Sequence, residues 1–193
     1  MLALLLALPM QAAAQGTDGG SEPEPSSPSD HSSAGGAEYG VDPDAVPRVT
    51  VPGRKAVLTK EGYAAAPAAA PRPVQEAVWA AKEIVGKPYR YGGGHGSFKD
   101  TGYDCSGTIS YALHGGGLLD SPLNSSGFMR WGQKGKGRWI TVYTNPGHAF
   151  VVIAGLRLDT SAAGERRSSG KGPRWRQNLR GGRGFRLRHP AGL

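Results

Sequence analysis

The chain has 193 residues, which is enough for one domain with a substantial hydrophobic core and accessory segments. Its 31 glycines and 15 prolines indicate a large share of turns, loops and linkers. The single cysteine excludes an internal disulfide, and no apolar run reaches the ~20 residues of a membrane-spanning helix. Neither a disulfide framework nor a membrane span is therefore expected.

Charge is divided sharply along the sequence. Residues 1–47 hold seven acidic residues and no Lys or Arg, whereas residues 48–193 hold all 23 Lys and Arg residues and eight acids, a net charge of +15. The basic part of the chain is expected to attract polyanions. Anionic cell-wall polymers, anionic membranes and nucleic acids all fit this property.

The N-terminal residues resemble an export signal. An apolar run at residues 2–8 is followed by Pro9 and by three alanines at residues 12–14, so residues 1–14 are predicted to be a signal peptide. A secreted, periplasmic or cell-wall location follows from that prediction. An Ala- and Leu-rich unstructured start is the alternative, because no Lys or Arg precedes the apolar run. Residues 15–47 have little to bury, and we expect a disordered acidic linker there.

Residues 48–73 are predicted to form a short hairpin and an Ala/Pro linker. The segments 48–51 and 56–59 flank a Pro-Gly pair, which indicates two short strands joined to each other. Residues 64–73 consist largely of Ala and Pro and are expected to be the linker.

The main folded domain is predicted to span residues 74–193. Apolar residues recur at helical spacing from Val74 to Val85, and Gly86 ends this helix. A glycine-rich loop over residues 87–104 follows.

Cys105 stands immediately before an apolar segment that predicts a helix over residues 106–114. A cysteine in the first turn of a helix lies where peptide dipoles and free N–H groups favour the thiolate, so we interpret Cys105 as a nucleophile. A buried, inert cysteine is the alternative, but its polar neighbours Asp104 and Ser106 argue against it.

The C-terminal half predicts strands. Residues 118–131 are polar and turn-rich, and strands are expected at 139–143, 148–153 and 156–160, with a turn over 144–147.

A thiolate nucleophile needs a base, and His148 is the best candidate. It begins an apolar strand directly after a Pro-Gly turn, where a histidine can face a cleft. Asp159 follows eleven residues later, so a tight hairpin would bring it beside the imidazole to orient it; Asn145 is a weaker rival. The alternatives are an exposed histidine at a strand end and an aspartate that caps the next turn. His95, in the glycine loop, is a candidate for the cleft wall.

The stretch from Pro88 to Gly107, with its aromatic-Gly-Gly run, together with Pro146-Gly147-His148, resembles the NlpC-type cell-wall cysteine peptidases. The resemblance implies an α+β, papain-like fold in which the nucleophile opens a helix packed on an antiparallel sheet. It implies hydrolysis of a peptide bond in peptidoglycan stem peptides, typically between D-glutamate and a diamino acid. No cofactor is implied, and one cysteine without zinc-site spacing argues against a metal.

Carried over residue by residue, Cys105 matches the nucleophile and His148 the base. The third catalytic position of the family is most often His, sometimes Asn or Gln, whereas the matching place here holds Asp159.

The same resemblance implies substrate-binding residues. Tyr91 matches the aromatic residue that lines the cleft near the thiol. Asp104 and Ser106 match the polar pair beside the nucleophile, which in some members contacts the substrate's free amine. With His95, these are the predicted substrate-binding residues.

Residues 165–188 carry nine basic residues against one acid. An Arg-Gly-Gly run at residues 180–185 looks like an RNA-binding segment, but one copy in a chain with an export signal is weak evidence, and no nucleic acid is expected. A solvated basic face is the commoner explanation, and adhesion to anionic cell-wall polymers is another.

The sequence thus predicts an exported peptidoglycan endopeptidase. Two alternatives stay open. One is a non-enzymatic protein that binds polyanions or the cell wall with an inactive peptidase-like core. The other is a Cys–His amidase or acyltransferase, since the acyl-enzyme step is shared.

Overall fold

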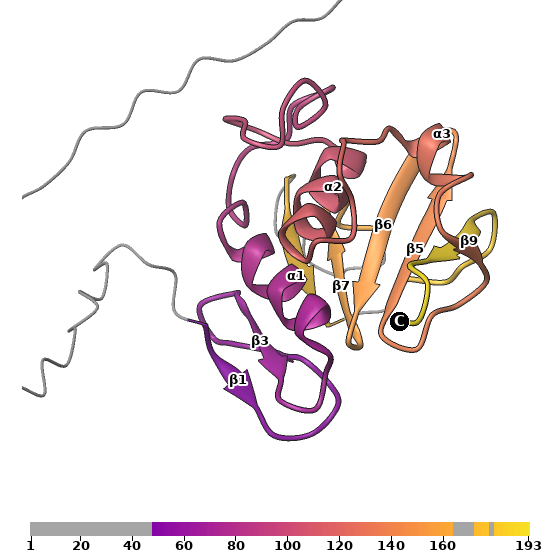
Figure 1. The fold of residues 1–193 in the computed structure, drawn as a ribbon. Coiled ribbons are helices and arrows are strands. Elements are labelled where there is room, and N and C mark those ends of the chain that lie inside the picture. The colour runs from indigo at the N-terminus through magenta and orange to yellow at the C-terminus, as the bar shows by residue number, and fades with distance from the viewer. Residues whose placement is uncertain (1–47, 164–171, 178–179) are drawn as a thin grey trace, which may run out of the picture. The chain divides into compact units, whose positions relative to one another are not determined.

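The structure, a computed structural model, describes residues 48–163, 172–177 and 180–193 (Figure 1). The predicted signal peptide (1–14), the predicted acidic linker (15–47) and parts of the basic segment (165–188) lie outside the described residues. The described part combines helices with a mostly antiparallel set of strands, which confirms the predicted α+β class.

The main sheet has six strands in the order β4-β9-β5-β6-β7-β8, and every neighbouring pair is antiparallel. The strands are β4 (Gln133–Lys134), β5 (Ile140–Asn145), β6 (His148–Ile153), β7 (Leu156–Asp159), β8 (Arg174–Arg176) and β9 (Arg186–His189). The three predicted strands are confirmed. The predicted turn over 144–147 is shorter, because β5 continues to Asn145 and only Pro146 and Gly147 connect it to β6.

Two helices cover one face of this sheet (Figure 1). The helix α1 (Arg72–Lys82) packs against α2 (Cys105–Gly115), and α2 packs on β6 and β7. The two helices approach closely at Gly115, where a Cβ atom would lie 2.2 Å from the Cβ atom of Ala80. The core formed by these helices and strands fixes the start of α2, and with it Cys105, at one end of the sheet.

The predicted hairpin at residues 48–59 is wrong. The strands β1 (Thr50–Val51) and β2 (Val57–Leu58) do not pair with each other but flank β3 (Ala64–Pro67), in parallel and antiparallel register respectively. The predicted linker is also wrong at β3, since all four of its residues are buried. Its alanines gave no strand signal because alanine has low strand propensity; here small side chains allow α1 to pack closely on the strand.

The described part of the basic C-terminal segment forms two strands of the main sheet. The strands β8 and β9 complete the sheet, and both Trp175 and Arg176 are buried in β8. The prediction of a solvated basic face is therefore wrong for β8. No helix within the described ranges combines the length and apolar character that a membrane crossing requires.

Candidate active site

Cys105 is the first residue of α2, and Asp104 caps that helix. The Asp104 carboxylate accepts the backbone N–H of Gly107 at 2.8 Å, and the Asp104 carbonyl accepts the Thr108 hydroxyl at 2.7 Å. The first N–H groups of a helix have no partner within it, and the helix dipole places partial positive charge there. The thiol thus lies where a thiolate, and an oxyanion formed beside it, are stabilised.

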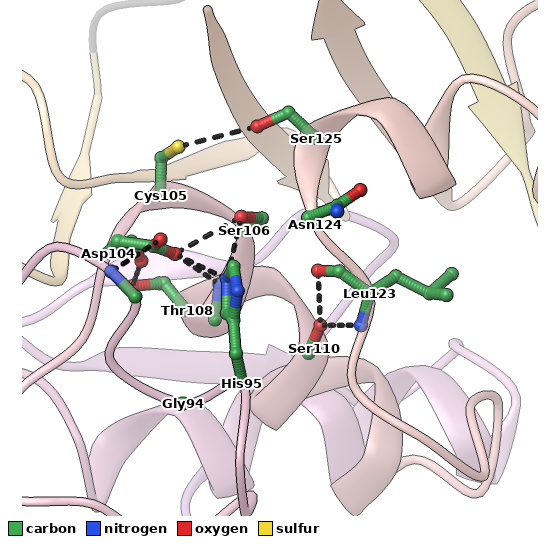
Figure 2. A network of polar contacts seen from close by, with 12 residues as sticks. Gly94, His95, Asp104, Cys105, Ser106, Thr108, Ser110, Leu123, Asn124 and Ser125 are labelled. Carbon is green, nitrogen blue, oxygen red and sulfur yellow. Dashed lines mark hydrogen bonds and ion pairs between the residues drawn. The ribbon is translucent and has the colours of Figure 1, made fainter. Parts of the chain in front are cut away.

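A cavity of about 290 Å³ opens at the thiol. Its walls are the glycine loop, the start of α2, the start of α3 (Ser125–Phe128) and the turn between β5 and β6. The hydroxyl of Ser110 accepts the N–H of Leu123 at 3.0 Å, which ties the segment before α3 to α2 (Figure 2). Two walls of the cavity are therefore bonded to each other.

His148 and Asp159 meet on neighbouring strands. The Nε2 atom of His148 lies 3.0 Å from the Oδ1 atom of Asp159, whose side chain is fully buried. Because Nε2 is engaged by the carboxylate, Nδ1 is the ring nitrogen left for the thiol. The structure thus brings together all three predicted catalytic residues.

Cys105 and His148 shift each other's pKa in opposite directions. Burial alone raises the pKa of the Cys105 thiol, but the hydrogen bond and charge of His148, with the backbone N–H of Ala149, lower it overall. Burial alone lowers the pKa of His148, but its hydrogen bonds to Asp159 and Cys105 raise it to about 9. Both shifts favour the thiolate and the imidazolium over the neutral pair.

The Asp159 carboxylate is held on several sides. Its Oδ1 atom also accepts the N–H of Ser161 at 2.8 Å. The guanidinium groups of Arg157 and Arg180 lie 3.6 and 3.8 Å from its Oδ2 atom. Two cations near a buried carboxylate offset the free-energy penalty of its burial.

Asn145, the weaker candidate for orienting the His148 ring, has a different role. Its side-chain oxygen accepts the N–H groups of Gly147 and His148 at 3.0 and 2.9 Å. Its amide donates to the carbonyl of Gly184 at 3.1 Å. Asn145 therefore fixes the turn that presents His148, while Asp159 contacts the ring.

Two tyrosines of the glycine loop border the cavity. Tyr91 borders the cavity but is 94% exposed, whereas Tyr89 is 40% exposed and also borders it. Burial and then the charge of Cys105 raise the pKa of Tyr89. The two tyrosines lie two positions apart in the sequence, and the family resemblance selected Tyr91, the more exposed of the two.

Ser125 is a site residue that the sequence analysis missed. Its hydroxyl lies 3.8 Å from the Cys105 sulfur (Figure 2). Its carbonyl accepts the Thr144 hydroxyl at 2.6 Å. The Asn124 side chain caps this turn through the N–H of Gly127. An Asn-Ser-Ser-Gly run is a helix-start signal, but only the tertiary fold brings it to the thiol.

The remaining predicted residues form a network at the other side of the thiol. Nε2 of His95 lies 3.0 Å from Asp104 and 3.1 Å from Ser106 (Figure 2). All three border the cavity. His114, by contrast, lies in the last turn of α2 and contacts the carbonyl of Leu119 through Nδ1. Within the described residues, no group of three or more His, Cys, Asp or Glu side chains is placed to hold a metal ion.

No protein-family model and no curated protein matches this chain. Among solved structures, it is similar to the peptidoglycan hydrolase RipB from Mycobacterium tuberculosis, with 22% identity, a TM-score of 0.46, and coverage of 61% of this chain and 64% of that chain. A mutant of the resuscitation promoting factor interacting protein RipA matches with 20% identity, a TM-score of 0.46, and coverage of 63% and 65%. A hypothetical invasion protein of Mycobacterium tuberculosis matches with 20% identity, a TM-score of 0.44, and coverage of 62% and 65%. The chain thus spans slightly less than two thirds of these structures' lengths.

Proposed function

We propose that the chain is an exported peptidoglycan hydrolase with a papain-like catalytic core. It cleaves a peptide bond in stem peptides, of the D-glutamyl-diamino acid type, with Cys105 as nucleophile. The observation that supports this most directly is the position of Cys105 at the start of α2 beside His148, whose other ring nitrogen is 3.0 Å from the buried Asp159.

The residues suit acyl transfer in two steps. The Cys105 thiolate attacks the amide carbonyl, and the resulting oxyanion forms beside the free N–H groups at the start of α2. The C–N bond breaks as protonated His148 donates its proton to the departing amine. Water, deprotonated by His148, then attacks the thioester and releases the acid and the thiolate. Asp159 orients the ring and stabilises the imidazolium.

The test uses the full chain and a synthetic stem peptide, with products identified by mass spectrometry. The wild-type chain and a His189→Ala control should release the diamino acid portion with a new amino terminus. Cys105→Ala and His148→Ala should each reduce the rate by about 10³-fold or more. Equal product from the Cys105→Ala protein, or no product from the wild type, would reject the proposal.

An amidase or acyltransferase would share the acyl-enzyme. Adding an amine acceptor separates the cases, because an acyltransferase forms a new amide in place of the free acid. An amidase would instead cleave at the amide that joins the peptide to its glycan, which gives products of different mass.

One observation favours polyanion binding as a second function. Lys134 in β4 lies directly opposite Arg188 in β9, and like charges at such positions repel. Both residues line a cavity of about 350 Å³ with Arg186, and the sequence has no acid from residue 121 to 158. A phosphodiester polymer would relieve this repulsion. Binding of such a polymer should weaken with salt and with Arg186→Ala, and should be unchanged in Cys105→Ala.

A further inference from the structure

The Arg-Gly-Gly run of the C-terminal segment packs beside His148. The side-chain amide of Asn145, in the turn that presents His148, donates to the carbonyl of Gly184 at 3.1 Å. The Phe185 ring meets the Phe150 ring edge to face, with centroids 5.1 Å apart, and its centroid lies 6.4 Å from that of the His148 ring. The run is therefore attached to the strands that carry the proposed base.

Arg180, the first residue of this run, reaches the carboxylate that orients His148. Its Nη1 atom lies 3.8 Å from Oδ2 of Asp159, and this nitrogen is buried although the side chain as a whole is 28% exposed. Oδ1 of the same carboxylate is engaged by Nε2 of His148 and the N–H of Ser161. For Oδ2, the described residues supply ion pairs and no hydrogen bond. Positive charge is therefore what holds this half of the carboxylate.

Arg157 is the other cation on this carboxylate, and it belongs to the core. It is fully buried, its Nε atom lies 3.6 Å from Oδ2 of Asp159, and its Nη1 atom donates to the carbonyl of Ala163 at 3.2 Å. Arg176 in β8 donates instead to the backbone carbonyl of Asp159 at 3.3 Å. Replacing Arg157 would leave a hole in the core, whereas the partly exposed Arg180 can be replaced without one.

Two aromatic rings hold the Arg180 guanidinium in place. Its Cζ atom lies 5.8 Å from the centroid of the Phe150 ring and 5.4 Å from that of the Phe185 ring. A guanidinium near the face of an aromatic ring is attracted by the negative charge of that face. Arg180 is thus fixed beside the carboxylate but does not border the cavity at the thiol.

We propose that Arg180 is a positioning residue, whose guanidinium holds the Asp159 carboxylate where it orients the His148 ring. Arg180 acts through Asp159 and does not touch the substrate. The Arg-Gly-Gly run then supports the catalytic residues, which neither a solvated face nor a nucleic-acid site would do. This inference rests on the proposed function and adds a residue to it.

The test measures kcat and KM separately on one synthetic stem peptide. Arg180→Ala should lower kcat about tenfold or more and leave KM within about twofold, since Arg180 does not border the cavity. Arg180→Lys keeps the charge and should recover most of the loss. Arg183→Ala is the matched control, because Arg183 is an exposed arginine of the same run, and it should behave as the wild type.

Chemical rescue distinguishes a positioning role from a loss of folding. Millimolar guanidinium chloride supplies the missing group from solution and should raise the kcat of Arg180→Ala at least about threefold. It should not raise that of the wild type or of Arg183→Ala, and sodium chloride at the same concentration should have no effect. If circular dichroism shows that Arg180→Ala does not fold, Arg180→Met, which keeps the aliphatic stem, replaces it in the comparison with Arg180→Lys.

Each outcome decides. An unchanged kcat in Arg180→Ala, an equal loss in Arg183→Ala, or a loss that neither lysine nor guanidinium restores overturns the inference, while Cys105-dependent cleavage leaves the proposed function standing. If the wild type cleaves no peptide, the proposed function fails, and alkylation of Cys105 by iodoacetamide at neutral pH decides separately. Because Arg180 supports the imidazole that ionises the thiol, alkylation should slow about threefold or more in Arg180→Ala but not in Arg183→Ala. Equal alkylation rates overturn the inference.

Discussion

Nε2 of His148 lies 3.0 Å from Oδ1 of Asp159, and this contact joins the first residue of β6 to the last residue of β7. The β6–β7 hairpin fixes the two residues on adjacent strands, so the backbone rather than a flexible loop sets the distance. The carboxylate is fully buried, whereas the imidazole is partly accessible. The imidazolium that forms during proton transfer thus has a preorganised counter-charge.

The first prediction concerns Asp159→Asn, which removes that counter-charge. Burial lowers the pKa of His148, but the hydrogen bond to Asp159 is the largest opposing cause. The pKa is raised overall from 6.5 to about 9. The variant should bring this pKa back toward 6.5. The alkaline limb of the kcat/KM profile should then move to lower pH, with a loss of kcat of about 10³-fold. An NMR titration of the imidazole measures the shift directly.

The raised pKa of His148 also predicts how the stability of the chain changes with pH. A histidine whose folded pKa is raised contributes stability that is complete below pH 6.5 and is lost as the pH rises through about 9. The wild-type chain should therefore lose more stability than Asp159→Asn between these limits. An exposed acid, Asp120, provides the control, since Asp120→Asn should change neither profile. An unmoved alkaline limb in Asp159→Asn would refute the assigned role.

The second prediction concerns thiol reactivity. His148 and Ser125 both lower the pKa of Cys105, His148 more strongly, against burial. Alkylation by iodoacetamide at neutral pH should be fast in the wild type. It should slow about tenfold or more in His148→Ala and less in Ser125→Ala. Rates measured from pH 5 to 10 give the thiol pKa in each protein, and identical rates in all three would show that the pair is not coupled.

The hairpin that carries His148 and Asp159 could be predicted from the sequence for a clear reason. The apolar run of β6 and the Pro-Gly turn that precedes it are both local signals, and a separation of eleven residues fits two paired strands. The cysteine at a helix start also has a local signal, because Asp104 is a typical cap.

Other parts depend on contacts that no local pattern encodes. Ser125 reaches the thiol from 20 residues away, through a four-residue helix. The sequence of β3 resembles a linker because alanine has low strand propensity. In the structure, α1 covers these alanines and they form a strand. His95 was expected at the cavity, but its contact with Asp104 was not, since it depends on the conformation of the glycine loop.

The third prediction separates the two tyrosines of the glycine loop. Tyr89 is 40% exposed and its pKa is raised by partial burial and then by the charge of Cys105, whereas Tyr91 is 94% exposed. Tyr89→Ala should lower kcat/KM about tenfold, and Tyr91→Ala should stay within about twofold of the wild type. Steady-state kinetics on one stem peptide measure both. A larger loss in Tyr91→Ala would restore the assignment made from the family match.

The fourth prediction concerns how the glycine loop is held on α2. A Cβ atom at Gly107 would lie 2.0 Å from the carbonyl oxygen of Gly93, a backbone atom that cannot rotate away. Gly107→Ala should therefore displace the loop that carries His95, and destabilise the chain by about 1–3 kcal/mol. Thermal unfolding and kcat/KM on one stem peptide measure the two effects.

Gly96 supplies the matched control for this substitution. It lies in the same loop, beside His95, but a Cβ atom there would meet nothing within 4 Å. Gly96→Ala should change stability by no more than about 0.5 kcal/mol and leave kcat/KM unchanged. If Gly107→Ala is equally neutral, the loop is not held by contact with α2. The position of His95 would then need another explanation, because its backbone would be free to move away from Asp104.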